Sequence, residues 1–262
     1  MVKVRIAASL AVLAVGALVM LAVAIPTLGL ARRLYAEVIG RAIGIAVLGV
    51  WGIRHRVLRD APIPAGQVVY VSNHPSSLDV FILIALGLPR TRYFLSGFLR
   101  KLPPLFVIGY LIRMFWTVPQ EFPERRRRIF ARADRILRRS GDSVYLSPEG
   151  TRVATGSIGP FNKGAFHLAT SLGAPIVPLY LRIPREVDPG MGYVPGAGTV
   201  DVHVLPAIDT SAWTLADLER NRDRVRELFV RVHEHVKATG SLPHDLAVGV
   251  VAGSAVHAGA AT

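Results

Sequence analysis

The chain contains no cysteine. Disulfides, thiolate metal sites and a cysteine nucleophile are therefore excluded, although this absence does not identify the cellular compartment. Acidic residues are also scarce, because 18 Asp and Glu face 31 Lys and Arg, which leaves a net charge of +13. This positive excess predicts an anionic partner, namely a bilayer surface, a phosphorylated substrate or a nucleic acid.

Several familiar motifs are missing as well. The sequence has no G-x-S-x-G segment, which argues against a serine nucleophile on a strand-to-helix elbow. His233 and His235 lack the H-E-x-x-H spacing of a zinc site, so we assign them to a solvated helix face. The run 125–128 consists of four arginines and opens an amphipathic helix, but no recognisable nucleic-acid module lies beside it. We therefore expect no nucleic acid, no metal and no other cofactor. We attribute the run to anionic lipid headgroups, to the acidic surface of an acyl carrier protein or to the phosphates of coenzyme A.

A long stretch near the N-terminus lacks charge altogether. Residues 6–30 form 25 uncharged positions, with Lys3 and Arg5 before them and Arg32 and Arg33 after them. Such a stretch is long enough to span a hydrocarbon core of about 30 Å as a helix. The alternative is a signal peptide, with residues 22–24 as its cleavage site.

A second apolar run, residues 42–53, is too short to cross a bilayer. Residues 1–58 are therefore predicted to be a membrane-anchoring helical segment, either a hairpin in one leaflet or one span followed by an interfacial helix. Basic residues on both sides of the first run give little orientation. The positive excess farther along, including Arg100, Lys101 and Arg113, favours the cytoplasmic face of the cell (inner) membrane for the rest.

From about Pro62 the pattern changes to alternating strands and helices. This alternation predicts an α/β domain over residues 59–240, with a mixed, largely buried sheet flanked by helices. Residues 241–262 are rich in Ala, Gly and Val and are expected to form a poorly ordered tail. The expected strands are residues 68–72, 93–95, 115–118, 144–147, 176–181 and 200–204, and the expected helices are residues 78–86, 123–139 and 215–237, the last opened by Thr214 with Asp217.

Two polar motifs follow two of these strands. The first reads VSNHPSSLDV and the second LSPEGTR, and both can be read as simple turns, the first with a helix cap. However, the carboxyl ends of strands in an α/β sheet are where ligands bind, so the two motifs are expected to share one crevice. The second motif offers a carboxylate, backbone amides, a hydroxyl and a guanidinium, which suit a phosphate or a polyol.

Together these motifs resemble the lysophospholipid and 1-acylglycerol-3-phosphate acyltransferase family. Asn73 and His74 with Asp79 match its NHxxxxD motif, and residues 148–152 match its PEGTR block, with Ser147 where Phe is usual. Phe161, Lys163, Gly164 and Ala165 resemble the F-x-[KR]-G-A segment, and residues 174–178, APIVP, resemble the fourth block. The resemblance covers residues 68–181 in the order and spacing of the family.

The resemblance implies an acyl transfer from a thioester, acyl-CoA or acyl carrier protein, to a lyso-phospholipid hydroxyl, most simply that of 1-acyl-sn-glycerol-3-phosphate. A neutral imidazole suits the removal of the hydroxyl proton, and a carboxylate behind it fixes the tautomer. His74 is thus expected to be the general base and Asp79 its orienting partner. Substrate-binding residues implied by the match are Asn73, Glu149, Gly150, Thr151, Arg152 and, more weakly, Lys163, with the acyl chain in an apolar groove from the segment 94–115.

The sequence departs from the family in two places. The second block usually ends in an arginine that helps to hold phosphate, but here it reads FWTVPQ, and a lysine usual near Ser96 is absent. The acceptor is therefore left open between 1-acyl-sn-glycerol-3-phosphate and a different lyso-lipid or hydroxylated lipid. A membrane-bound hydrolase or transacylase and a non-catalytic lipid-binding protein are the remaining alternatives.

Overall fold

A seven-stranded mixed sheet organises the molecule in the computed structural model, which describes residues 1–59, 61–153, 156–188 and 194–243. The strand order is β1-β7-β6-β2-β5-β3-β4, and every neighbouring pair is parallel except β6 with β7. The predicted α/β class with a mixed sheet is therefore confirmed. The strands are β1 Ile53–Arg59, β2 Val69–Ser72, β3 Thr91–Ser96, β4 Phe115–Thr117, β5 Ser143–Leu146, β6 Ile176–Arg182 and β7 Gly198–Val204.

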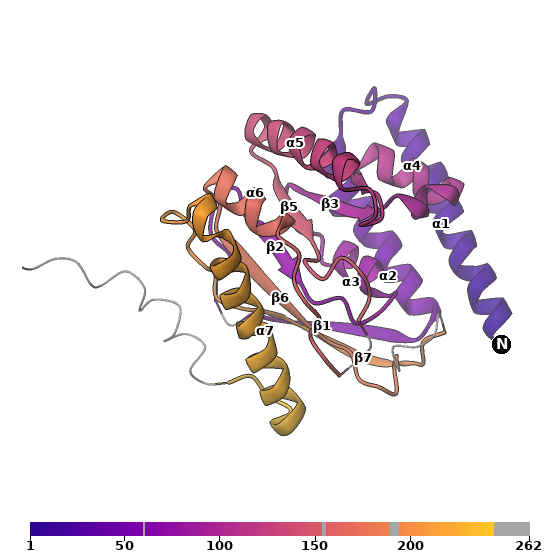
Figure 1. The fold of residues 1–262 in the computed structure, drawn as a ribbon. Helices are drawn as coiled ribbons and strands as arrows, with labels where there is room; N and C mark the ends of the chain where they lie inside the picture. The colour runs from indigo at the N-terminus through magenta and orange to yellow at the C-terminus, as the bar shows by residue number, and fades with distance from the viewer. Residues whose placement is uncertain (60, 154–155, 189–193, 244–262) are drawn as a thin grey trace, which may run out of the picture.

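Helices cover both faces of this sheet (Figure 1). Val69 and Val71 of β2 pack toward α5, α6 and α7, whereas Tyr70 of β2 and Val68, just before the strand, pack on the side of α3. Burial from both sides explains why the central strands read as continuous apolar runs. The helices are α1 Val2–Ala24, α2 Arg41–Val50, α3 Asp79–Ala85, α4 Pro103–Leu111, α5 Pro123–Ser140, α6 Gly164–Leu172 and α7 Leu218–Thr239, with the π-helix η1 Leu34–Gly40 and the short 3₁₀ helices η2 Gly97–Lys101 and η3 Leu215–Asp217.

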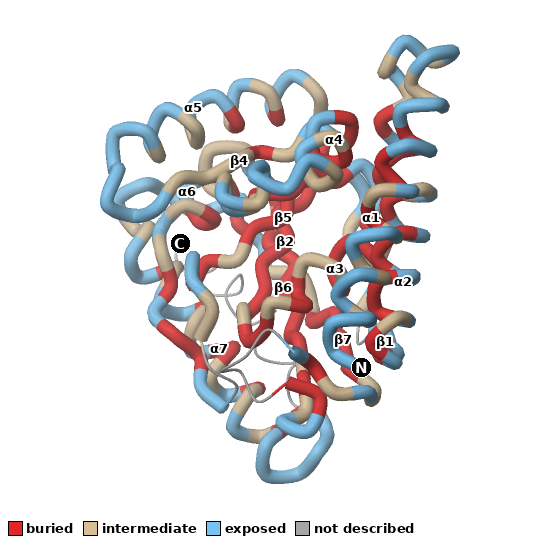
Figure 2. Tube along the Cα trace, turned by 90° about the vertical axis from the view of Figure 1, so that its right-hand side faces the viewer, coloured by how far each residue is buried: buried red, intermediate tan, exposed pale blue. Residues whose placement is uncertain are grey.

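The N-terminal helices belong to the body of the molecule. One side of α1 packs against α2 and α4 and buries Leu13 and Met20, while the other side is exposed and apolar (Figure 2). Beyond α1, Arg32 bonds the buried carboxylate of Asp142, which also accepts from Arg92 at 2.8 Å. Within the described residues, α1 is the one helix that is long and apolar enough to cross a membrane, judged by length and composition.

Most of the predicted elements coincide with observed ones, and the differences are local. The sheet already begins at Ile53, inside the segment 1–58 that we assigned to the anchor. The Thr214 hydroxyl bonds the Asp217 carboxylate at 2.8 Å and does not cap a backbone amide, so the last helix starts with the 3₁₀ turn η3. Strand β1 and helices α4 and α6 were not predicted. Of the expected tail, residues 244–262 lie outside the described part of the chain.

Candidate active site

The first motif forms the connection between β2 and α3. Asp79 is the first residue of α3 and is buried, with 2% of its side chain exposed, whereas 32% of the His74 side chain is exposed. The Nδ1 atom of His74 lies 2.6 Å from Oδ2 of Asp79. A carboxylate at Nδ1 favours the tautomer that is protonated there, which leaves the lone pair on Nε2. The pair can therefore accept a proton at Nε2 of a partly exposed ring.

Ser76 and Asp188 support this pair from the protein interior. The backbone N–H of Ser76 donates to Oδ2 of Asp79 at 3.2 Å, and its Oγ accepts from the Leu78 amide at 3.0 Å. The Ser76 hydroxyl donates in turn to the carboxylate of Asp188, which is itself buried. Sequence reasoning missed Asp188, although its place after the carboxyl end of β6 is a signal of the kind that led to the two motifs.

Burial is the main influence on the Asp79 carboxyl. It raises the pKa of Asp79, because a charged carboxylate is disfavoured away from water. The hydrogen bond with His74 opposes this rise, and so does the Ser76 amide. The hydrogen bond with His74 thus favours the charged form of the Asp79 carboxylate.

Asn73 fastens the same loop to the sheet. Its Nδ2 donates to the Leu181 carbonyl at 3.0 Å, and its Oδ1 accepts from the Leu181 amide at 2.8 Å. The side chain is buried and holds β6 with both of its polar atoms. Asn73 thus lies beside His74, in a position that fixes the loop.

The second motif meets the first at the carboxyl ends of β5 and β2, which are neighbours in the sheet. One oxygen of Glu149 accepts from the His74 amide at 2.5 Å, and the other accepts from the Gly159 amide at 2.6 Å. The Val153 amide donates to the His74 carbonyl at 3.0 Å. Nη1 of Arg152 lies 3.3 Å from Oγ of Ser77. The structure therefore brings the guanidinium of Arg152 against the loop that carries His74.

The other predicted binding residues differ in position. Gly150 has a φ of +71°, and a Cβ there would lie 2.7 Å from Nδ2 of Asn162, so this turn requires glycine. Thr151 is exposed beside it. Lys163 precedes α6, and its ammonium pairs with Glu219 on α7, away from both motifs.

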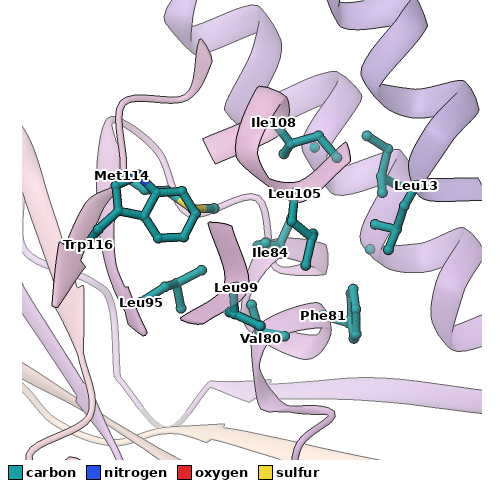
Figure 3. A pocket seen from close by; sticks show the side chains of 13 residues that line it. Leu13, Val80, Phe81, Ile84, Leu95, Leu99, Leu105, Ile108, Met114 and Trp116 are labelled. Atoms are coloured by element: carbon teal, nitrogen blue, oxygen red, sulfur yellow. The ribbon is translucent and has the colours of Figure 1, made fainter. Parts of the chain in front are cut away.

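An apolar cavity adjoins the pair on the side of the N-terminal helices. Its lining is almost wholly apolar, and Val80, the residue after Asp79, is one of its lining residues. Figure 3 shows side chains of α1, α3, α4, β3 and β4 directed into it. The segment 94–115 contributes Leu95, Leu99, Leu105, Ile108 and Met114, but Phe94 and Phe115 pack into the core on the other face of the sheet. The contribution of α1 and α2 was not predicted.

Among the described residues, no three His, Asp or Glu side chains gather as a metal site would require. His233, on α7, has its Nδ1 atom 3.0 Å from the Tyr180 hydroxyl. The contact of His74 with Asp79 suits proton transfer at the imidazole, and the Arg152 guanidinium and backbone groups lie beside it.

Comparisons with known proteins agree with this geometry. The family model described as Acyltransferase matches residues 54–182, which include both motifs. The chain is 34% identical over 169 residues to the chloroplastic 1-acyl-sn-glycerol-3-phosphate acyltransferase BAT2 of Brassica napus, covering 63% of this chain and 48% of that protein. It is 31% identical over 201 residues to the human 1-acyl-sn-glycerol-3-phosphate acyltransferase alpha, covering 73% of this chain and 68% of that protein.

The fold has a solved counterpart. The crystal structure of the 1-acyl-sn-glycerophosphate acyltransferase PlsC from Thermotoga maritima superposes with a TM-score of 0.65 at 20% identity, covering 92% of this chain and all of that one. This likeness concerns the fold, and the chain spans about half the length of the Brassica relative. On the family model and the human relative, the chain belongs to the lysophospholipid and 1-acylglycerol-3-phosphate acyltransferase family.

Proposed function

We propose that this protein transfers a fatty acyl group from a thioester to the free hydroxyl of 1-acyl-sn-glycerol-3-phosphate, which yields phosphatidate. The observation that carries the proposal is the 2.6 Å contact between Nδ1 of the partly exposed His74 and the buried Asp79. The names of the curated relatives supply the substrate class. The donor is acyl-CoA or acyl carrier protein.

In this proposal His74 handles the only proton that moves. Its Nε2 takes the proton from the lyso-lipid hydroxyl as that oxygen attacks the thioester carbonyl, and the tetrahedral intermediate then expels the thiolate. The imidazolium returns the proton to the thiolate, so the free thiol leaves and His74 is regenerated. General base catalysis of this kind contributes about 10² to 10⁴ in rate, and Asp79 stabilises the imidazolium.

The acceptor headgroup is assigned to the second motif. Arg152 supplies the phosphate partner, since its guanidinium already lies against Ser77, and Thr151 and the backbone at Gly150 are beside it. Glu149 and Asn73 act by holding the loops, because their polar atoms bond backbone groups. Lys163 would have to leave Glu219 to take part.

The acyl chain is assigned to the apolar cavity, which begins one residue after Asp79. We assign the protein to the cell (inner) membrane, with the catalytic domain on the cytoplasmic face. The exposed apolar side of α1 supports a contact with lipid. Anionic headgroups complement the net charge of +13.

The test replaces the proposed base. His74→Ala in the purified, detergent-extracted chain should lower thiol release from acyl-CoA with 1-acyl-sn-glycerol-3-phosphate by roughly 10² or more, because general base catalysis is lost. His167→Ala, on the exposed side of α6, is the matched control and should keep full activity. Circular dichroism checks that both variants fold. Unchanged turnover in His74→Ala would reject the assignment.

Product analysis separates this function from hydrolysis and from lipid-to-lipid transacylation. Phosphatidate formation that requires both thioester and lyso-acceptor supports the proposal. Free fatty acid as the main product, or transfer from another phospholipid without thioester, would replace it. A panel with other lyso-lipids or hydroxylated lipids as acceptors tests the substrate itself, and binding without any turnover would point to a non-catalytic protein.

A further inference from the structure

We propose that residues 97–111, which comprise η2 and α4, form a lid over the apolar cavity whose outer face inserts into a bilayer with anionic headgroups. This surface is separate from the exposed side of α1. The inference rests on the proposed function for the nature of the chain in the cavity, but its contact with lipid can be measured without any turnover.

The segment is apolar on two faces. Its inner face contributes Leu99, Leu105 and Ile108 to the cavity (Figure 3). Its outer face presents Phe98, Phe106 and Tyr110 with 67%, 47% and 71% of their surface exposed. The rings of Phe106 and Tyr110 lie one helical turn apart, with centroids at 6.4 Å. Three exposed aromatic residues on fifteen positions form a patch that a soluble surface seldom carries, and such patches mark interaction sites.

The charges around this patch have one sign. Arg100, Lys101 and Arg113 are exposed at its border, and the Lys101 ammonium lies 5.0 Å from the centre of the Phe98 ring. The sequence contains no acidic residue between Asp79 and Glu121. Aromatic rings flanked by lysine and arginine are typical of the membrane–water interface, where the rings enter the headgroup layer and the cations meet lipid phosphates.

The position of the patch also favours a lipid surface. α4 packs directly on α1, and the exposed side of α1 carries Val15 and Leu18. Figures 1 and 2 show α1 and α4 together at one side of the molecule, with α7 at the other. Exposed apolar side chains thus lie on two helices that pack against each other, with basic residues beside those of η2 and α4. An acidic carrier protein would use the cations but would leave the three rings in water.

The absence of cysteine makes the test direct. Single cysteines are introduced as Phe106→Cys and Tyr110→Cys, labelled with an environment-sensitive dye, and the full chain is reconstituted into vesicles of equal parts phosphatidylcholine and phosphatidylglycerol. The fluorescence of both labels should shift to the blue, and an aqueous quencher should lose most of its access to them. With phosphatidylcholine alone both effects should be weaker, and Arg100→Gln with Lys101→Gln should reduce the difference between the two compositions.

Two further labels serve as references. Leu18→Cys, on the outer side of α1, reports that the chain has reached the vesicles, and Leu215→Cys, 60% exposed in η3 before α7, should stay accessible to the quencher. Labels at 106 and 110 that remain as accessible as the label at 215 would overturn the proposal, whether or not the label at 18 enters lipid. Shielding by soluble acyl carrier protein and not by vesicles would overturn it as well. Because turnover is not measured, failure here is distinct from failure of the acyltransferase assignment.

Discussion

Glu149 joins the two loops of the candidate site through the backbone. Its carboxylate oxygens accept one amide each, from His74 and from Gly159. Burial raises the pKa of Glu149, and these two hydrogen bonds oppose the rise by favouring the charged form. We therefore give Glu149 a positioning role in the proposed reaction.

Glu149→Gln tests this role, since glutamine turns one of the two acceptor oxygens into an N–H donor that meets a backbone amide. An unsatisfied buried donor costs about 1–3 kcal/mol, so the thermal midpoint and kcat should both fall. KM for the acceptor should change little. Glu124→Gln, exposed at the start of α5, is the control and should resemble the parent. A variant with raised KM and unchanged stability would instead assign Glu149 to acceptor binding.

Asp188 is expected to position the loop that carries His74, through its hydrogen bond with the Ser76 hydroxyl. Asp188→Ala should lower kcat by roughly tenfold or more, because a hydrogen bond to a charged group contributes about 1.5–3 kcal/mol. Asp188→Asn keeps an acceptor oxygen and should retain more activity. Asp223→Ala, on the exposed side of α7, provides the baseline. Equal kcat in Asp188→Ala and Asp223→Ala would remove Asp188 from the site.

For single residues of the site, the sequence predicts contacts within one motif. It does not predict contacts between segments that are far apart in the chain. The resemblance of residues 73–79 to the NHxxxxD motif implied that Asp79 orients His74, and the two side chains are indeed in contact. Asp188 comes from a connection far along the chain and matches no motif, so only the topology of β6 and β2 brings it to Ser76. The pairing of Lys163 with Glu219 likewise depends on the packing of α6 on α7.

Helices and strands could be predicted where apolar and polar residues alternate clearly along the sequence. Strands β2, β5 and β6 are buried on both faces and read as apolar runs bounded by turns. β1 has the sequence IRHRVLR and is mostly exposed at the edge of the sheet, so it gives no such signal. α4 is apolar all round, because the cavity adjoins one face and the proposed bilayer the other, and a helix without a polar face shows no 3.6-residue period.

The packing of α2 on α3 requires a glycine that no pattern identified. A Cβ at Gly44 would lie 2.8 Å from the Phe81 carbonyl oxygen and 2.9 Å from the Ala85 amide nitrogen, both backbone atoms of α3. Gly44→Ala should therefore displace the helix that begins with Asp79. We expect a loss of about 1–3 kcal/mol in stability, measured by thermal unfolding in detergent, together with reduced turnover.

Gly49→Ala is the matched control on the same helix. A Cβ at Gly49 meets nothing within 4 Å, so the substitution should be neutral or should stabilise the helix by up to ~1 kcal/mol. If both alanine variants unfold at the same temperature, the close approach of α2 to α3 is not a constraint on the fold.

In the molecule as a whole, the N-terminal helix α1 packs into the protein core on one side and is exposed on the other. Leu13, Ala17 and Met20 of α1 are buried in one cluster with residues of α3, α4 and the sheet, and the opposite side of α1 is exposed. The expectation of a membrane anchor followed by a separate domain described only the exposed side. Hydropathy alone does not distinguish lipid from a protein core, since both accept the same side chains.

Deletion of residues 1–31 should therefore destabilise the whole chain. Each large apolar side chain removed from the core contributes roughly 1.5–3 kcal/mol, against a total stability of about 5–15 kcal/mol for a typical protein. The truncated chain should aggregate in size-exclusion chromatography and show no turnover. Deletion of residues 244–262 is the comparison and should leave both properties intact. A soluble, active product of the first deletion would show that α1 is a detachable anchor.

Only Trp51 and Gly52 separate α2 from β1, and β1 pairs with β7 along its whole length. A two-residue connection leaves no slack between the helical layer and the sheet. On the proposed bilayer, we therefore expect the His74 imidazole to stay at a constant height above the leaflet. If lyso-lipid is the acceptor, as proposed, we expect it to arrive by lateral diffusion, so that the rate follows its surface density in the vesicle and not its bulk concentration.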